Sequence, residues 1–599
     1  MVGPRRGPSG NPGDFLWTYD PSVVTTTDGR QWMFYGSYYG GISVTRLSAD
    51  GRRAVGEPTR VAIDNKFEGA YPVHHGGYWY LFASTANCCL GPTTGYSVQV
   101  GRSRSVKGPY LDAQGVPLDT SRAGGTPTLV QNGNRWVGTG HNAVLTDLAG
   151  RDFIVYHGID RTKPFLSGTS GINRRPMLMD RLDWVHGWPA VRAGRGPSEA
   201  PQRGATTGGR AVTDFAGGVP AAFRTTGRWV TGHDPQSGRL VSARRSGTVT
   251  TRAPGGEQVR VEADLRSSGK RYGLQVTLGT STLRARVEPG RDRLTLQQSR
   301  GGRVVATTHQ PLPAHTASTW HAVALEVRGG KATATVSAAR LADPVAVAHL
   351  TLRSPGTLHR AGAFASGRGV RVDNLSVVRA ARRVTELAPD RVPSTLDRSS
   401  SDEFTGSALN SGWSWVREDA AATVAGGRLT WPTEQADLNG PGSKAGVLLR
   451  SPGSGPWTIQ TKVSLDVGVD RVLNYAQAGL VAYVDDDQFA RLSSVAIWNT
   501  RQTEFGHEIP WPDEDEVQNG GTIVGPPAAT TWLRLTHRVD RTNGEHELRA
   551  WTSRDGHDWV KGGVWTLPAG SDVKVGLVSQ GRTTDVATTA RFDYFRLYR

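Results

Sequence analysis

Sulfur-containing residues are scarce in this chain, whose 599 residues include 2 cysteines and 4 methionines. The two cysteines, Cys88 and Cys89, are adjacent, and this spacing fits no zinc site. Neighbouring Cα atoms lie closer than an ordinary disulfide prefers, so free thiols and a strained vicinal bridge are equally compatible with the sequence. Cysteine usage therefore says little about the redox compartment.

Long apolar runs and helical periodicity are also absent from the sequence. No run of about 18 apolar residues could span a membrane, and residues 1–10 lack the apolar segment of a secretory signal. The formal net charge of +17 comes mainly from scattered arginines, without a dense basic block. We therefore expect neither a membrane nor a nucleic-acid partner, whereas a basic surface suits an acidic polysaccharide matrix.

What the chain has in place of these features is glycine, proline and short strands. Its 75 glycines and 34 prolines separate alternating runs rich in Val and Thr. This pattern predicts an almost wholly β protein. A chain of this length needs several hydrophobic cores, so we expect three or four domains.

Three hairpins in the first third of the sequence resemble one another. Each begins with a polar residue, Asp20, Glu68 or His141, runs through a short strand to a Gly turn, and ends in a second strand rich in aromatic residues. The intervals are nearly equal, so we expect the three polar residues to open their strands in the same phase. Repeated units of this kind are typical of β-propeller blades.

The first strands of propeller blades line the central axis, so these three side chains are predicted to meet at one mouth of the fold. Converging carboxylates suit acid and base catalysis on a glycosidic bond. From the residues alone, Asp20 could itself be the base that activates water. Each residue taken singly is equally compatible with a solvated turn, and His141 with a hydrogen-bonded core histidine.

Two breaks in composition divide the chain. Residues 194–209 are rich in Gly and contain two prolines, and prolines recur among Ser and charged residues between 380 and 401. The segments after the first break repeat each other, since 259–265 matches 457–463 and 370–375 matches 590–595. Alternating strands over such lengths favour two-sheet jelly-roll sandwiches. The predicted parts are a disordered lead (1–13), a propeller region (14–195), a linker (196–210), a β-sandwich (211–380), a linker (381–400) and a second sandwich (401–599).

Several motifs, in order, resemble glycoside hydrolase family 43, and most closely its arabinan endo-1,5-α-L-arabinosidase branch. They are Trp-Thr-Tyr-Asp-Pro-Ser-Val-Val (17–24), Tyr-Gly-Ser-Tyr-Tyr-Gly-Gly-Ile (35–42), Phe-Glu-Gly-Ala-Tyr (67–71), Val-Gly-Arg-Ser-Arg-Ser-Val-Lys-Gly-Pro-Tyr-Leu-Asp (100–112), Arg-Trp-Val-Gly-Thr-Gly-His-Asn (135–142) and Gly-Trp-Pro (187–189). The resemblance covers residues 15 to about 195. It implies an all-β chain with a partial propeller, three blades of five. The last segment, with Gly-Trp-Ser-Trp-Val-Arg (412–417), resembles the concanavalin-like sandwich often appended to these enzymes. The segment before it is similar to the last one, so we expect two concanavalin-like jelly-roll β-sandwiches after the propeller.

The resemblance also implies roles for the mouth residues in an inverting mechanism that uses three carboxylates. Glu68 is similar to the general acid, and Asp20 to the carboxylate that orients the acid and modulates its pKa. His141 resembles a histidine that helps to hold Ca²⁺ or a similar cation through water. A structural cation in the sandwiches is a further, minor hypothesis.

Substrate-binding candidates flank these residues. Trp17 and Tyr39 are candidate sugar-stacking walls, although blade packing explains either aromatic equally well. Asn142 is a candidate substrate ligand. The family's general base, an Asp in an Asp-Pro motif of the first blade, has no counterpart here, so we expect the first two blades to be missing, through a misplaced gene start or through loss.

We therefore expect a secreted glycoside hydrolase that cleaves α-L-arabinofuranosyl linkages of arabinan and pectin side chains and is impaired in this chain. Its signal peptide would be lost with the missing blades. One alternative is a non-catalytic carbohydrate-binding protein whose sandwiches present Trp413, Trp415, Trp498 and Trp511 to a polysaccharide. Another is a β-xylosidase or exo-arabinofuranosidase of the same family.

Overall fold

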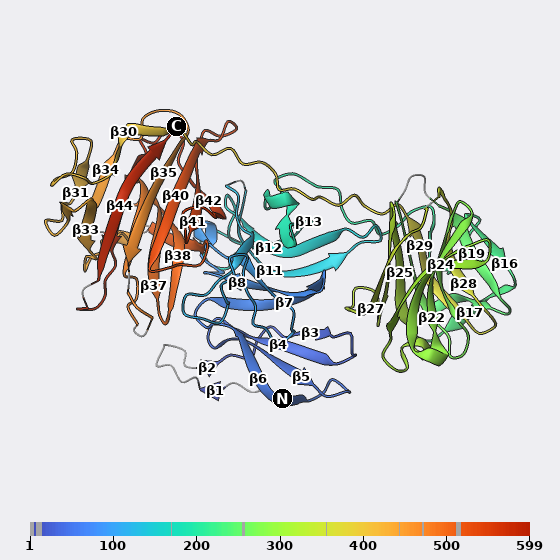
Figure 1. Cartoon of the computed structure of the whole chain (residues 1–599). Helices are drawn as coiled ribbons and strands as arrows, with labels where there is room; N and C mark the ends of the chain where they lie inside the picture. The colour runs from blue at the N-terminus through green and yellow to red at the C-terminus, as the bar shows by residue number, and fades with distance from the viewer. Residues whose placement is uncertain are drawn as a thin grey trace.

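The computed structural model describes most of the chain, and its fold is all-β (Figure 1). The described residues are 5–6, 15–133, 135–168, 170–253, 258–354, 356–442, 444–465, 467–469, 472–510, 517–586 and 588–599. The expected disordered lead falls outside them, apart from β1 (Arg5–Arg6), which pairs with β2 (Phe15–Leu16). Helical segments are single 3₁₀ turns, namely η1 (Gly91–Thr93), η2 (Arg192–Gly194), η3 (Pro289–Arg291), η4 (Thr316–Ser318) and η5 (Gly440–Gly442). In the described part, no helix is long and apolar enough to cross a membrane.

Three four-stranded antiparallel sheets follow one another from residue 22 to residue 191, each a meander of consecutive strands. The first contains β3 (Ser22–Thr25), β4 (Gln31–Ser37), β5 (Gly41–Leu47) and β6 (Ala54–Ala62). The second contains β7 (Phe67–His75), β8 (Tyr78–Thr85), β9 (Ser97–Ser103) and β10 (Thr126–Leu129). The third contains β11 (Trp136–Thr146), β12 (Asp152–Asp160), β13 (Met177–Val185) and β14 (Trp188–Val191). These sheets have the connectivity of propeller blades, which confirms the partial propeller.

Apolar side chains on both faces of the second sheet hold the three blades together. Leu81 and Ala83 of β8 belong to one core cluster, which also contains Phe34 and Ile42 of the first blade. Phe82 of β8, on the other face, packs in a second cluster with residues of the third blade. Because β8 is buried on both faces, its sequence is a continuous apolar run, unlike the alternating strands of the sandwiches.

The first sandwich packs an eight-stranded sheet against a seven-stranded one. The eight strands are β15 (Val212–Thr213), β17 (Trp229–Asp234), β18 (Gly238–Ala243), β20 (Gln258–Arg266), β25 (His321–Arg328), β26 (Lys331–Ser337), β27 (Pro344–Thr351) and β29 (Arg371–Val378). The seven are β16 (Phe223–Thr226), β19 (Gly247–Arg252), β21 (Tyr272–Leu278), β22 (Ser281–Glu288), β23 (Arg293–Arg300), β24 (Arg303–Pro311) and β28 (Leu358–Ala365).

The last sandwich has the same plan. Its eight-stranded sheet contains β30 (Leu396–Asp402), β32 (Thr423–Ala425), β33 (Arg428–Pro432), β35 (Trp457–Leu465), β40 (Thr530–Val539), β41 (His546–Ser553), β42 (Val560–Leu567) and β44 (Thr589–Tyr598). Its seven-stranded sheet contains β31 (Ser414–Val416), β34 (Val447–Arg450), β36 (Gln477–Asp485), β37 (Gln488–Ile497), β38 (Thr500–Pro510), β39 (Val517–Ile523) and β43 (Lys574–Gln580). Strand order is identical in the two sandwiches, element for element, so the predicted repeat of two jelly rolls is confirmed.

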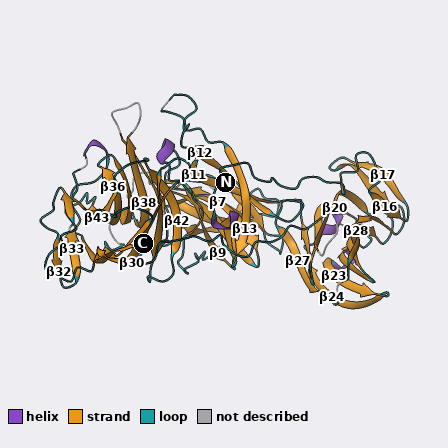
Figure 2. Ribbon diagram, turned by 90° about the horizontal axis from the view of Figure 1, so that it is seen from above, coloured by secondary structure: helices purple, strands orange, loops and turns teal. Residues whose placement is uncertain are grey.

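The two sandwiches lie on opposite sides of the blades in both views (Figures 1 and 2). The last sandwich contacts the blades closely: Gln99 Nε2 donates to the Val524 carbonyl at 2.9 Å, and Arg161 Nη2 lies 2.5 Å from Glu545 Oε2. The first sandwich makes a separate contact with the blades, in which the Thr25 amide donates to Asp343 Oδ2 at 3.0 Å. The blades are therefore the centre of the molecule, with one sandwich docked on each flank.

Candidate active site

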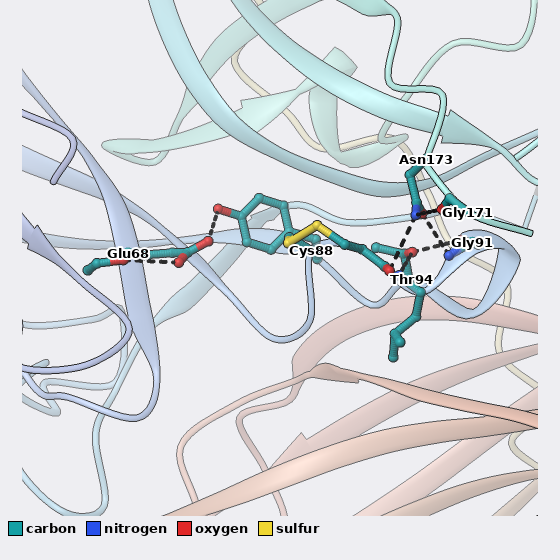
Figure 3. Close-up of a disulfide and its surroundings, with 10 residues drawn as sticks. Glu68, Cys88, Gly91, Thr94, Gly171 and Asn173 are labelled. Atoms are coloured by element: carbon teal, nitrogen blue, oxygen red, sulfur yellow. Dashed lines mark hydrogen bonds between the residues drawn. A yellow bond between two sulfur atoms is a disulfide. The ribbon is translucent and has the colours of Figure 1, made fainter. Parts of the chain in front are cut away.

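Glu68 lies at the start of β7, where hydroxyl groups hold both of its carboxylate oxygens. The Tyr96 hydroxyl donates to Oε1 at 2.5 Å, and Ser37 Oγ donates to Oε2 at 3.3 Å (Figure 3). Tyr96 comes from the loop between β8 and β9, and Ser37 ends β4 of the neighbouring blade. The orientation of Glu68 is thus fixed by two different blades.

Tyr96 is buried, with 1% of its surface exposed. Its ring stacks on that of His157, with centroids 5.5 Å apart and planes 7° from parallel. Burial, reinforced by the negative charge of Glu68, raises the pKa of Tyr96 well above its ordinary value of 10.0. Tyr96 therefore keeps its proton throughout the neutral range and donates a hydrogen bond to Glu68.

Asp20 and His141 form a pair at the same mouth. His141 Nε2 lies 3.7 Å from Asp20 Oδ1, and the His141 amide donates to Ser84 Oγ at 2.8 Å. The imidazole also approaches the Glu68 strand, because a Cβ built on Gly69 would lie 3.4 Å from His141 Nδ1. Asp20, Glu68 and His141 are therefore brought together, as the hairpin repeat predicted.

Strand register corrects one expectation about these residues. Glu68 pairs with Ser84 and Gly140 pairs with His157, and in each strand a bulge of two residues follows. The bulge residues after the pair are Gly69 in β7 and His141 in β11, both with positive φ, at 60° and 51°. Glu68 is therefore equivalent to Gly140, and its phase differs from that of His141 by one residue.

The first blade follows the pattern of the third. The Gly36 amide donates to the Tyr19 carbonyl at 2.9 Å, and Asp20 then takes the bulge position with φ 51°. The prediction of a shared phase is therefore right for Asp20 and His141 and wrong for Glu68. The sequence hid this offset because the Gly76–Gly77 turn of the second hairpin is shorter than the loops of the other two. A glycine at the bulge of the second blade leaves room for the His141 ring.

The aromatic candidates Trp17 and Tyr39 belong to one cluster beside Asp20. Their ring centroids lie 4.8 Å apart at 80°, and the Trp17 amide donates to the Tyr39 carbonyl at 3.1 Å. Tyr38 packs edge-on against Tyr39 at 5.3 Å, and Tyr19 packs against Trp17 at 5.2 Å. Both candidates thus pack on other aromatics while remaining partly exposed.

The last sandwich reaches this cluster, which the sequence did not indicate. Asn65 Nδ2 donates to Asn499 Oδ1 at 2.7 Å, and the Asn65 amide donates to the Tyr38 carbonyl at 2.7 Å. Burial raises the pKa of Tyr38, and Tyr39, Tyr475 of the sandwich and the carboxylates of Glu504 and Glu68 add to the rise. Two loops of the sandwich therefore form part of the rim around the mouth.

Asn142 is buried, with 4% of its surface exposed, and follows His141 in the bulge of β11. Neither its Oδ1 nor its Nδ2 has a hydrogen-bond partner within the described residues. A buried amide without partners calls for an explanation, and a bound ligand or water would supply one.

The mouth offers few side-chain ligands for calcium. His141 and Asp20 offer one imidazole nitrogen and one carboxylate, whereas calcium prefers about six to eight oxygen ligands. Among the described residues there is no group of three or more His, Cys, Asp or Glu side chains that could hold a metal ion. These residues do not form a direct calcium site, so the expected cation stays a prediction and no step below depends on it.

The tryptophans considered for the sandwiches have different surroundings. Trp413 packs against Phe595, at 5.0 Å between centroids, and donates from Nε1 to Asp402 Oδ2 at 2.9 Å. Trp415 packs edge-on against Trp431, again at 5.0 Å. Trp498 lies in the turn beside Asn499, near the mouth, and Trp511 lies outside the described residues. The first two are accounted for by packing.

Packed four-stranded blades with a carboxylate pair and a histidine at one mouth define a propeller segment with a candidate acid–base site. Residues 10–189 match the model of glycosyl hydrolases family 43, so this segment is similar to that family. Residues of the site that sequence reasoning missed, Tyr96 and Ser37, lie inside the matched segment. Ser37 lies in the motif 35–42 but had no predicted role, and Tyr96 belongs to no quoted motif; only the fold reveals their contacts with Glu68.

Two curated relatives share this segment. The chain is 33% identical over 194 residues to the extracellular exo-α-(1→5)-L-arabinofuranosidase ArbA of Cellvibrio japonicus, a match covering 29% of this chain and 52% of that protein. It is 31% identical over 176 residues to the extracellular endo-α-(1→5)-L-arabinanase 1 of Bacillus subtilis, covering 28% and 50%. The chain thus spans about half the length of the curated relatives it matches.

Two solved structures match over very different lengths of the chain. An α-L-arabinanase of Cellvibrio cellulosa is 31% identical, with 29% of this chain and 56% of that chain covered and a TM-score of 0.26. The family 43 protein BlXynB of Bacillus licheniformis is 12% identical, with 98% and 76% covered and a TM-score of 0.27.

Proposed function

We propose that this protein hydrolyses α-L-arabinofuranosyl linkages of arabinan or pectin side chains, with inversion at the anomeric carbon. One observation carries the proposal: Glu68 is held at both oxygens by hydroxyl donors and lies beside the Asp20–His141 pair at the mouth of the blades. An acid fixed in this way is suited to protonate a departing glycosidic oxygen.

In this mechanism Glu68 is the general acid, and Asp20 is the second carboxylate, which orients the site through His141. Trp17 and Tyr39 would flank the bound sugars, and the unpartnered amide of Asn142 would bind a sugar hydroxyl. The hydrogen bonds and ion pairs of the described residues bring no third acidic side chain against Glu68 or Asp20. Because an inverting enzyme needs a base to activate water, we expect slow turnover by this chain.

The choice of substrate is supported by the relatives, whose names specify α-(1→5)-L-arabinofuranosidase and α-(1→5)-L-arabinanase activities. Both are named as extracellular, which supports secretion of this protein as well. A polysaccharide partner also agrees with a mouth that is rimmed by aromatic side chains and by the last sandwich, since these widen the surface available to a long glycan.

The test is product analysis of the purified chain on linear α-1,5-arabinan and, separately, on xylo-oligosaccharides. We expect arabinose or its oligomers, released as the inverted anomer in proton NMR, and a rate about 10³-fold lower for Glu68→Gln. Hydrolysis of the xylo-oligosaccharides alone would favour the β-xylosidase alternative. Arabinan binding without hydrolysis, by both the unsubstituted chain and Glu68→Gln, would favour the non-catalytic alternative and contradict the proposal.

A further inference from the structure

Cys88 and Cys89 are joined to each other by a disulfide, which decides the alternative that the sequence left open. The bond lies in the loop between β8 and β9, and this loop starts and ends at the mouth because Thr85 pairs with Ser97. Within the described residues there is no free cysteine.

This disulfide cannot act as a staple of the fold. A cross-link stabilises a protein mainly by restricting the unfolded chain, and its effect grows with the length of chain that it closes. A bond between neighbours closes no segment, so its contribution to global stability is small. A local role at the protein surface is the better explanation of the pair.

The position of the bond indicates what that role is. Tyr96, at the end of the same loop, donates its hydroxyl to Glu68, and Glu68 is among the immediate surroundings of the disulfide in Figure 3. Cys89 is exposed and Cys88 is half-buried, so the pair lies at the protein surface. The disulfide therefore presents a polarisable, apolar surface beside the candidate general acid.

The loop is also held in place from the neighbouring blade. Asn173, in the loop between β12 and β13, accepts from the Gly91 amide at 2.7 Å through Oδ1 and donates to the Cys89 carbonyl at 3.4 Å through Nδ2. Thr94 Oγ1 accepts from the Leu90 amide at 2.9 Å. A surface fixed in this way loses little conformational entropy when a ligand binds.

We propose that the Cys88–Cys89 disulfide is one wall of a sugar-binding subsite next to Glu68, in contact with the C–H face of a pentofuranose ring. The inference rests on the proposed function, because it takes an arabinan chain as the ligand. It adds a specificity element, since a flat sulfur surface favours the apolar face of a sugar over a charged or bulky group.

The test measures binding of α-1,5-arabinohexaose by calorimetry to the full chain carrying Glu68→Gln, so that turnover does not interfere. Replacing the pair, as Cys88→Ala with Cys89→Ala, is expected to weaken binding about fivefold to tenfold. Asn87→Ala, at the exposed residue just before the pair, serves as the matched control and leaves the affinity unchanged. Reduction of the folded Glu68→Gln protein with a phosphine, which converts the bond to two thiols, gives a loss of the same direction.

The outcomes separate the two proposals. Equal affinity with and without the disulfide, in variants of equal melting temperature, overturns the subsite and leaves the proposed function standing. No binding of arabinohexaose to the Glu68→Gln chain with its disulfide intact overturns the choice of substrate and, with it, the subsite. Should the alanine pair fail to fold, the phosphine arm on folded protein decides.

Discussion

Lys66, two residues before Glu68, offers the sharpest prediction for the folded blades. Its side chain is buried, with 1% of its surface exposed, and Nζ donates to the carbonyls of Ala123 and Gly124 at 2.9 and 3.1 Å. The ammonium therefore fixes the start of the Glu68 strand to a loop of the same blade. We consider the substitution Lys66→Met, which keeps an unbranched side chain one atom shorter and removes the charge.

Burial lowers the pKa of Lys66 to about 7 from its ordinary value of 10.5, against the opposing effect of Asp112. Between these two pH values the unfolded chain holds a proton that the folded chain releases, so the unfolding free energy rises with pH. Below about pH 7 the cost of burying the charge is present in full. At about 1.4 kcal/mol for each pKa unit, the gain from pH 7 to pH 10 is on the order of 3 kcal/mol.

The assay is urea denaturation at a series of pH values, followed by tryptophan fluorescence, for the wild type and Lys66→Met. Other groups titrate in both proteins, so the difference between the two unfolding free energies isolates this lysine. We expect the difference to move by about 3 kcal/mol in favour of the wild type between pH 7 and pH 10. Lys107→Met, at an exposed lysine of the same blade, should give a constant difference. Parallel curves for Lys66→Met would refute the reasoning.

Three further substitutions test the site and the docking of the last sandwich. Tyr96→Phe removes the hydrogen bond that orients Glu68; we expect arabinan hydrolysis to fall about threefold to tenfold, since a hydrogen bond to a protonated acid contributes about 0.5–1.5 kcal/mol. Gly95→Ala places a methyl group 1.7 Å from the Gly521 carbonyl oxygen, so limited proteolysis should cut between blades and sandwich faster. Gly69→Ala puts a methyl group at a residue with φ 60°, against the imidazole of His141. We expect the unfolding free energy, measured by urea denaturation, to fall by about 1–2 kcal/mol.

Controls for these substitutions lie close by. Ser37→Ala removes a longer hydrogen bond to the same carboxylate and should reduce activity less than Tyr96→Phe; equal losses would contradict the role assigned to the phenol. Gly204→Ala meets no atom within 4 Å and should leave the proteolysis pattern unchanged. Unaltered proteolysis of Gly95→Ala would mean that the sandwich does not dock there in solution.

Strand-level features of this protein could be predicted from its sequence because they depend on residues that are close along the chain. The alternating runs predicted an all-β fold, and the matching segments 259–265 and 457–463 predicted two sandwiches of one plan, which the strand orders confirm. The hairpin repeat likewise placed Asp20, Glu68 and His141 at one mouth. Such patterns can be read from the sequence because side chains alternate between the two faces of a strand, which gives each strand a period of two residues.

Contacts across the blades, in contrast, were decided by the tertiary structure alone. The one-residue offset of Glu68 depends on bulges and turn length, which nearly equal intervals conceal. Tyr96 reaches Glu68 only because the loop after β8 folds back to the mouth, and Asn499 reaches Asn65 across 434 residues of sequence. No local pattern encodes partners this far apart; packing of whole sheets brings them together, and so it determines which side chains surround the candidate acid.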